Sequence, residues 1–112
     1  MKGSRGEPLD REPPRDARGE AARVLVIDDE PIIREVLHDI LTREGYFITL
    51  MPDAETGLEA LDRMEYDLII LDLMLPGLGG FEALKEIKKR DPDSVVVMIT
   101  AYGSVESAVQ GM

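Results

Sequence analysis

The chain has 112 residues, of which 44% are hydrophobic and none is cysteine, and its formal net charge at pH 7 is −10. This length and composition predict a single domain with one modest core. Because so acidic a protein repels nucleic acid phosphates and anionic lipids, direct binding to DNA, RNA or a membrane is not expected. No apolar run reaches the roughly eighteen residues of a membrane span, and we expect a cytoplasmic location.

Residues 1–22 differ in composition from the rest of the chain. This segment carries five basic and five acidic side chains, so the net charge belongs to residues 23–112. It is rich in proline and glycine and has almost no large apolar side chain. Since it cannot bury enough apolar surface to offset the entropy of ordering, we expect a disordered N-terminal tail.

From Arg23 onward, short apolar runs alternate with segments of helical periodicity. The runs RVLVID, YFITLM, DLIILD and SVVVMIT predict four strands, most of them apolar on both faces, as in strands covered by helices on each side. The other segments predict four helices. The first spans residues 31–44 and has the apolar stripe Ile33, Val36, Leu37, Ile40 and Leu41. The second is capped by Asp53, the third contains Phe81, Leu84 and Ile87, and the fourth begins near Ser104.

The strand-helix alternation predicts right-handed crossovers and a parallel sheet with helices on both faces. The carboxyl ends of all strands then lie at one edge, which is where open parallel sheets place their sites. Asp28 and Asp29 follow the first predicted strand, Asp72 ends the third, and Thr100 ends the fourth. If the first and third strands are neighbours, the three carboxylates share one pocket.

Three carboxylates in one pocket require a positive partner. Two carboxylates about 4 Å apart repel by roughly 4 kcal/mol at an effective dielectric of 20. Mg²⁺ fits best, because it takes oxygen ligands and accepts one or two carboxylates.

A carboxylate beside this ion can attack phosphorus to give an aspartyl phosphate. We choose Asp72 as the acceptor, since it precedes the glycine-containing loop LMLPGLGG, with Thr100 bonding the phosphoryl oxygens.

Three blocks of the sequence resemble a known family. VLVIDDEP, DLIILDLMLPGLGGFE and VVVMITAYGSVESAV are similar to the receiver domain of bacterial two-component response regulators, and the resemblance covers residues 23–112. It implies a flavodoxin-like, doubly wound sheet with the strand order 2-1-3-4-5. The AYGSVESAV segment resembles most the receivers of NtrC-type activators, which work with sigma-54 polymerase.

The resemblance also implies roles for individual residues. Asp72 accepts a phosphoryl group from a sensor histidine kinase or a phosphotransfer protein, and Thr100 is the switch hydroxyl. The metal ligands are Asp28, Asp29, Asp72 and the backbone carbonyl of Met74. Ile32 is apolar yet lies off the stripe of its helix, and the resemblance implies that this helix face docks the kinase. The domain is expected to control an output, such as transcription, as a phosphorylated switch and not as an enzyme.

The chain departs from the family pattern at its C-terminal end. Four of the usual five strand-helix units are present, so residues 23–112 are expected to be a C-terminally incomplete receiver. The fifth strand, its helix and a phosphoryl-binding lysine would lie beyond Met112. The SVVVMIT strand would then be an apolar sheet edge, which favours a homodimer through that strand or domain exchange.

Two other functions remain open. A receiver-like module could dimerise or bind partners without being phosphorylated, which the missing lysine favours. A Mg²⁺-dependent phosphohydrolase would use the same nucleophile, but Met74 stands where such enzymes commonly have a second acid. Any one of the three aspartates alone could be a helix cap or a turn residue, whereas their combination favours a site.

Overall fold

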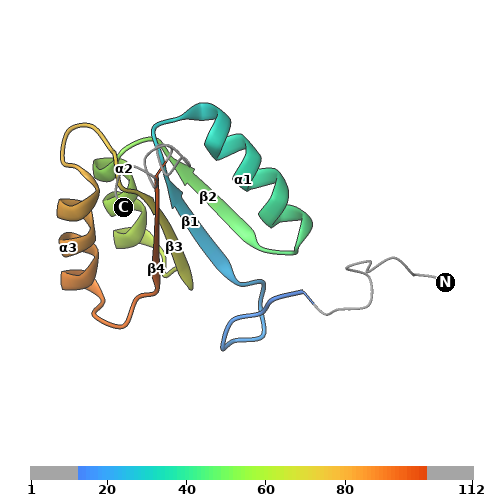
Figure 1. Ribbon diagram of the computed structural model, residues 1–112. Helices are drawn as coiled ribbons and strands as arrows, with labels where there is room; N and C mark the ends of the chain where they lie inside the picture. Colours follow the sequence, from blue (N-terminus) through green and yellow to red (C-terminus); the bar gives the residue numbers. More distant parts are fainter. Residues whose placement is uncertain (1–12, 101–112) are drawn as a thin grey trace, which may run out of the picture.

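A computed structural model describes residues 13–100, and the helix predicted from about Ser104 lies outside the described residues. Strands and helices alternate throughout this region (Figure 1). Within it, no helix is both long and apolar enough to cross a bilayer. The elements are β1 (Arg23–Ile27), α1 (Pro31–Arg43), β2 (Phe47–Met51), α2 (Ala54–Arg63), β3 (Leu68–Asp72), α3 (Gly80–Arg90) and β4 (Val96–Ile99).

The four strands form one parallel sheet in the order β2-β1-β3-β4, which confirms the predicted fold class. β1 lies between β2 and β3, so Ile27 is in register with both Met51 and Leu71. Asp72 is in register with Ile99 of β4. Helix α1 covers one face of the sheet, and α2 and α3 cover the other (Figure 1).

The central strand β1 explains why its sequence is a continuous apolar run. Val24, Leu25, Val26 and Ile27 are all fully buried. Leu25 and Ile27 belong to the core beneath α2 and α3, whereas Val24 and Val26 pack with side chains from α1. Because successive side chains point to opposite faces, a strand covered on both sides must be apolar at every position.

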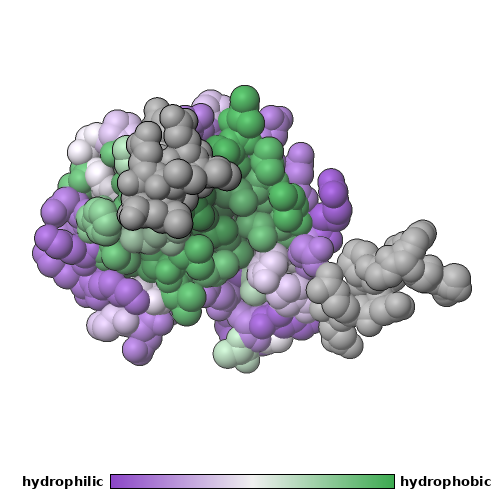
Figure 2. Space-filling model, in the orientation of Figure 1, coloured by the Kyte–Doolittle hydropathy of each residue, from purple (hydrophilic) through white to green (hydrophobic). Residues whose placement is uncertain are grey.

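Helix α1 buries less of its apolar stripe than the sequence predicts. Leu37 and Leu41 pack against the Val24 and Val26 face. Val36 and Ile40, in contrast, are 47% and 49% exposed. The reason is that α1 contacts β1 and β2 but leaves the same face of β3 and β4 uncovered among the described elements. Figure 2 shows the resulting apolar surface between α1 and β4.

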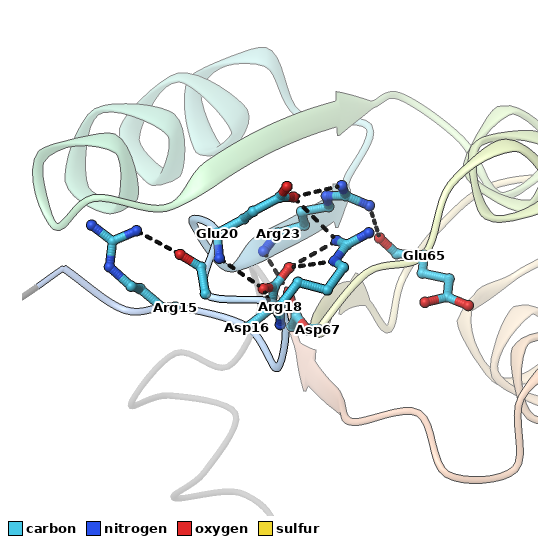
Figure 3. Close-up of polar contacts among 8 residues, drawn as sticks. Arg15, Asp16, Arg18, Glu20, Arg23, Glu65 and Asp67 are labelled. Atoms are coloured by element: carbon cyan, nitrogen blue, oxygen red, sulfur yellow. Dashed lines mark hydrogen bonds and ion pairs between the residues drawn. The ribbon is translucent and has the colours of Figure 1, made fainter.

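Residues 13–22 form a turn at the amino edge of the sheet (Figure 3). The Asp16 carboxylate accepts hydrogen bonds from the backbone amides of Arg18 and Glu20 (2.8 and 3.0 Å) and from the Arg18 guanidinium (2.8 Å). The Arg23 amide, at the start of β1, donates to Asp67 Oδ2 (2.7 Å). Local polar turns of this kind require little apolar burial, and the disorder predicted for residues 1–22 stays a prediction. Residues 1–12 lie outside the described part of the chain.

Candidate functional site

Three aspartates meet at the carboxyl edge of the sheet. Asp28 and Asp29 follow β1, and Asp72 is the last residue of the neighbouring β3. One carboxylate oxygen from each lies within 4.8 Å of the other two. Asp28 and Asp72 are each 1% exposed, whereas Asp29 is open to solvent. The structure therefore brings together the three acids that the sequence places at the ends of separate strands.

The backbone around Asp28 is held at three points. Its amide donates to the carbonyl of Met51 in β2 (3.0 Å), and its Oδ1 accepts from the amide of Glu30 (2.8 Å). Its carbonyl accepts from Arg34 Nη1 (2.7 Å). The last contact is one that sequence reasoning missed, because nothing in the spacing shows that a helical arginine turns back toward the preceding strand.

Asp72 is oriented by the loop that follows it. The amide of Met74 donates to Asp72 Oδ1 (3.0 Å), a short-range turn that directs the carboxylate. This bond places the Met74 backbone beside the acceptor carboxylate, while the role of its carbonyl as a metal ligand stays a prediction.

Glycine at position 80 lets α3 start against the backbone of the Asp72 strand. A Cβ at Gly80 would lie 2.6 Å from the carbonyl oxygens of Asp72 and Leu73. In the structure, the close approach at Gly80 is to the protein's own backbone. Gly80 thus allows helix and strand to meet beside the acidic site.

Thr100 directly follows β4 at the same edge. The amide of Leu73 donates to the carbonyl of Ile99 (2.6 Å), so the residue after Asp72 is joined by the sheet ladder to the residue before Thr100. This register places Thr100 on the side of the sheet edge next to the Asp72 loop. Its function as a switch hydroxyl stays a prediction.

The electrostatics of the three acids are unfavourable without a cation. Burial raises the pKa of Asp28, and the nearby charges of Asp72 and Asp29 act in the same direction, against the Glu30 hydrogen bond. Burial also raises the pKa of Asp72, with Asp29 adding to the effect and the Met74 amide opposing it. Among residues 13–100, no basic side chain forms an ion pair with these carboxylates.

This donor set fits a hard divalent cation. It offers only carboxylate oxygens, two buried and one exposed, from two adjacent strands. Mg²⁺ prefers such oxygen ligands and keeps water or phosphate oxygens in its remaining positions. A bound cation would also favour the ionised form of acids whose pKa the protein otherwise raises.

A parallel sheet in this strand order, with an acidic site at its carboxyl edge, places the chain among the flavodoxin-like, doubly wound α/β proteins. Comparison with known proteins identifies the family: the model of the response regulator receiver domain matches residues 24–112. The chain therefore belongs to the response regulator receiver domain family.

Several relatives support this assignment. The uncharacterized transcriptional regulatory protein YkoG of Bacillus subtilis is 38% identical over 93 residues, which are 83% of this chain and 41% of YkoG. The chain thus spans about two fifths of that relative's length. NtrX of Brucella abortus, in complex with ADP, is 41% identical with a TM-score of 0.71, covering 80% of this chain and 21% of NtrX.

A third relative, the response regulator TrrA of Thermotoga maritima, has been solved in two complexes. In complex with Mg²⁺-BeF, it is 40% identical with a TM-score of 0.70, covering 80% of this chain and 78% of TrrA. The other complex contains the histidine kinase ThkA; there the identity is 42% and the TM-score 0.69, with 75% of this chain and 72% of the matched chain covered.

Proposed function

We propose that the domain accepts a phosphoryl group on Asp72 from a histidine kinase in a Mg²⁺-dependent reaction and changes conformation to control an output. The observation that carries this proposal is the placement of Asp72, buried at the sheet edge with Asp28 and Asp29 carboxylate oxygens within 4.8 Å. Membership of the receiver family and the Mg²⁺-BeF complex of TrrA support it.

Each residue of the site has a separate role in the proposed phosphoryl transfer. A carboxylate oxygen of Asp72 attacks the donor's phosphorus, a new P–O bond forms, and the bond to the donor's leaving group breaks with its electron pair. The Met74 amide orients the attacking carboxylate. Asp28 and Asp29, with Asp72 and the Met74 carbonyl, would hold Mg²⁺, which when bound offsets the negative charge of the transferring group.

Phosphorylation would be transmitted through Thr100. Its hydroxyl would bond the new phosphoryl oxygens, and the loop after Asp72 would shift with it, because Leu73 and Ile99 are already hydrogen-bonded. Such a switch enlarges a conformational population that exists before phosphorylation. In this role the domain is a phosphoacceptor that assists its own modification, and not a turnover enzyme.

Partners and output form the next part of the proposal. The ThkA complex of TrrA supports a sensor histidine kinase as donor, and Ile32, at the start of α1, is 69% exposed and available for docking. The likeness to YkoG and NtrX supports control of transcription and an NtrC-type regulator. The reaction would take place in the cytoplasm, without direct nucleic acid contact by this segment.

A homodimer through β4 is also proposed. β4 ends the described sheet, and Val95 and Val97 are 57% and 45% exposed, which leaves an apolar edge. Sedimentation velocity should show concentration-dependent dimers that Val97→Lys removes. Phe47→Lys, at an exposed apolar position on the opposite edge strand β2, is the control. Dimers that survive Val97→Lys would contradict this edge as the interface.

Acetyl phosphate with Mg²⁺ tests the main proposal. Intact-mass spectrometry should show one added phosphoryl group on the wild-type chain and none on Asp72→Asn. No added mass would favour the alternative, an interaction module that is not phosphorylated. Steady phosphate release without a stable adduct would favour a phosphohydrolase. Asp39→Asn, at an exposed position on α1, is a control expected to behave like the wild type.

A further inference from the structure

The side chain of Arg34 turns back from the first turns of α1 to the end of β1. Its Nη1 donates to the carbonyl of Asp28 across 2.7 Å in a partly buried contact. The Arg34 amide meanwhile donates to the Glu30 carbonyl (3.1 Å) as part of the helix. One residue therefore connects the helix to the backbone of the first acid of the site.

The start of α1 has few other polar constraints. Glu30 is its N-cap but makes no side-chain capping bond, and the first turn contains no acidic residue. Pro31 occupies the first helical position, so it has no amide to donate. The guanidinium bond to Asp28 is therefore one of the few polar contacts that fix the start of α1 relative to the acidic turn.

The turn needs such a restraint because it carries like charges. The carboxylates of Asp28, Asp29 and Asp72 converge within 4.8 Å, so their repulsion pushes the exposed Asp29 away from the buried pair. Arg34 contacts a backbone carbonyl and not a carboxylate. Its effect is thus to fix geometry, without occupying the space between the acids.

We infer that Arg34 is a positioning residue, whose guanidinium holds the Asp28 carbonyl so that the β1–α1 turn presents Asp28 and Asp29 to Asp72. The consequence for Mg²⁺ and phosphoryl uptake rests on the proposed function, whereas the effect on the turn rests on the contact alone. Residues that orient metal ligands typically contribute about 10- to 100-fold in metal affinity.

The test compares Arg34→Met and Arg34→Lys with the wild-type chain. Arg34→Met keeps a long stem and removes the donor, and Arg34→Lys keeps the charge with a single donor group. Arg43→Met is the matched control, because it removes a basic side chain from the other end of the same helix. Two measurements are made: amide hydrogen exchange of Glu30 in metal-free protein, and Mg²⁺ affinity by calorimetry.

In Arg34→Met, we expect faster exchange of the Glu30 amide, which bonds Asp28 Oδ1, and about 10- to 100-fold weaker Mg²⁺ binding. Saturating Mg²⁺ should restore phosphorylation by acetyl phosphate. Arg34→Lys should lie between the two, and Arg43→Met should match the wild type. Wild-type exchange and affinity in Arg34→Met would overturn the inference.

Two further outcomes keep the test decisive. If Arg34→Met does not fold, Arg34→Lys decides: faster Glu30 exchange together with weaker Mg²⁺ binding supports the inference, and wild-type values of both, or a change in only one, overturn it. If the wild-type chain itself binds no Mg²⁺, the proposed function fails. Faster Glu30 exchange in Arg34→Met would then still support the positioning of the turn by Arg34.

Discussion

The carboxylate of Asp72 accepts a hydrogen bond from the backbone amide of Met74, with 3.0 Å between N and Oδ1. An asparagine at position 72 keeps an oxygen that can accept this bond, so Asp72→Asn removes charge with little change of shape. Because burial raises the pKa of Asp72, the ionised form is the destabilised one. Near neutral pH, we therefore expect Asp72→Asn to melt at a higher temperature than the wild type without metal.

Added Mg²⁺ should reverse this order. The wild-type chain gains stability from an ion that binds only its folded state, and Asp72→Asn gains less. Thermal melts with and without Mg²⁺ measure both effects. A wild-type melting temperature that does not respond to Mg²⁺ would contradict a metal site at these acids.

The free energy of unfolding should depend on pH through the ionisation of the two buried acids. The pKa values of Asp28 and Asp72 are raised in the folded protein, so the folded state binds more protons than the unfolded state above the ordinary value of 3.8. The two acids therefore stabilise the folded state fully below pH 3.8, and this stabilisation is lost as the pH rises through their pKa values in the folded protein.

Urea unfolding across this pH range checks the sign. The stability of the metal-free wild type should fall relative to Asp28→Asn as the pH rises above 3.8, and saturating Mg²⁺ should reduce the difference. A difference that grows in the opposite direction would show that these pKa values are not raised.

Gly80→Ala should perturb the acceptor strand. The added Cβ would lie 2.6 Å from two backbone carbonyls and 2.7 Å from the Leu73 Cα, and backbone atoms cannot move aside as a side-chain tip can. We expect a loss of about 1 to 3 kcal/mol in the free energy of unfolding, together with weaker Mg²⁺ binding. Denaturant titration and calorimetry measure these effects, and unchanged values in both would contradict the close packing of α3 on β3.

Gly57 lies against Ile27 in the core, so a substitution at one of these positions can be compensated by a substitution at the other. A Cβ at Gly57 would overlap Cδ1 and Cγ1 of Ile27. Although alanine favours a helix interior by about 1 kcal/mol over glycine, the overlap should make Gly57→Ala destabilising. Ile27→Val removes the Cδ1 atom, so the double variant should recover part of the loss. Additive losses in the double-mutant cycle would show that the two positions do not interact.

Asp16 should titrate unusually low. Its hydrogen bonds with the Arg18 side chain, then the Glu20 and Arg18 amides, lower its pKa to about 2. The turn's contribution to stability is therefore present above 3.8 and is lost as the pH falls through about 2. Carboxyl NMR chemical shifts measure the midpoint directly. In Arg18→Met, that midpoint should rise toward the ordinary value, whereas Arg43→Met should leave it unchanged.

The sheet and its acidic edge could be predicted because a short stretch of sequence is enough to show that a strand is buried and which residues stand at its end. β1 and β3 are apolar at nearly every position, and aspartates follow β1 and end β3, so a parallel arrangement alone brings the acids to one edge. The capping by Asp53 was equally local, since its carboxylate accepts from the Thr56 amide three residues later.

Other features depend on tertiary neighbours that periodicity does not encode. Val36 and Ile40 continue an apolar stripe, yet their exposure depends on how far α1 extends over the sheet. Phe81 marks the helical pattern of α3 but is 62% exposed. The Arg34 contact depends on the rotamer of one long side chain, and the Asp16 turn is stabilised by polar bonds in a segment with almost no apolar residues.

The unequal burial of the three acids has a kinetic consequence. Asp28 and Asp72 are enclosed, and Asp29 alone faces solvent. A cation that binds here as proposed would therefore first exchange part of its hydration shell at Asp29 and then reach the enclosed pair, and it would leave in the reverse order. Asp29 would thus govern how fast the site loads, while the enclosed pair would govern how long an ion resides there.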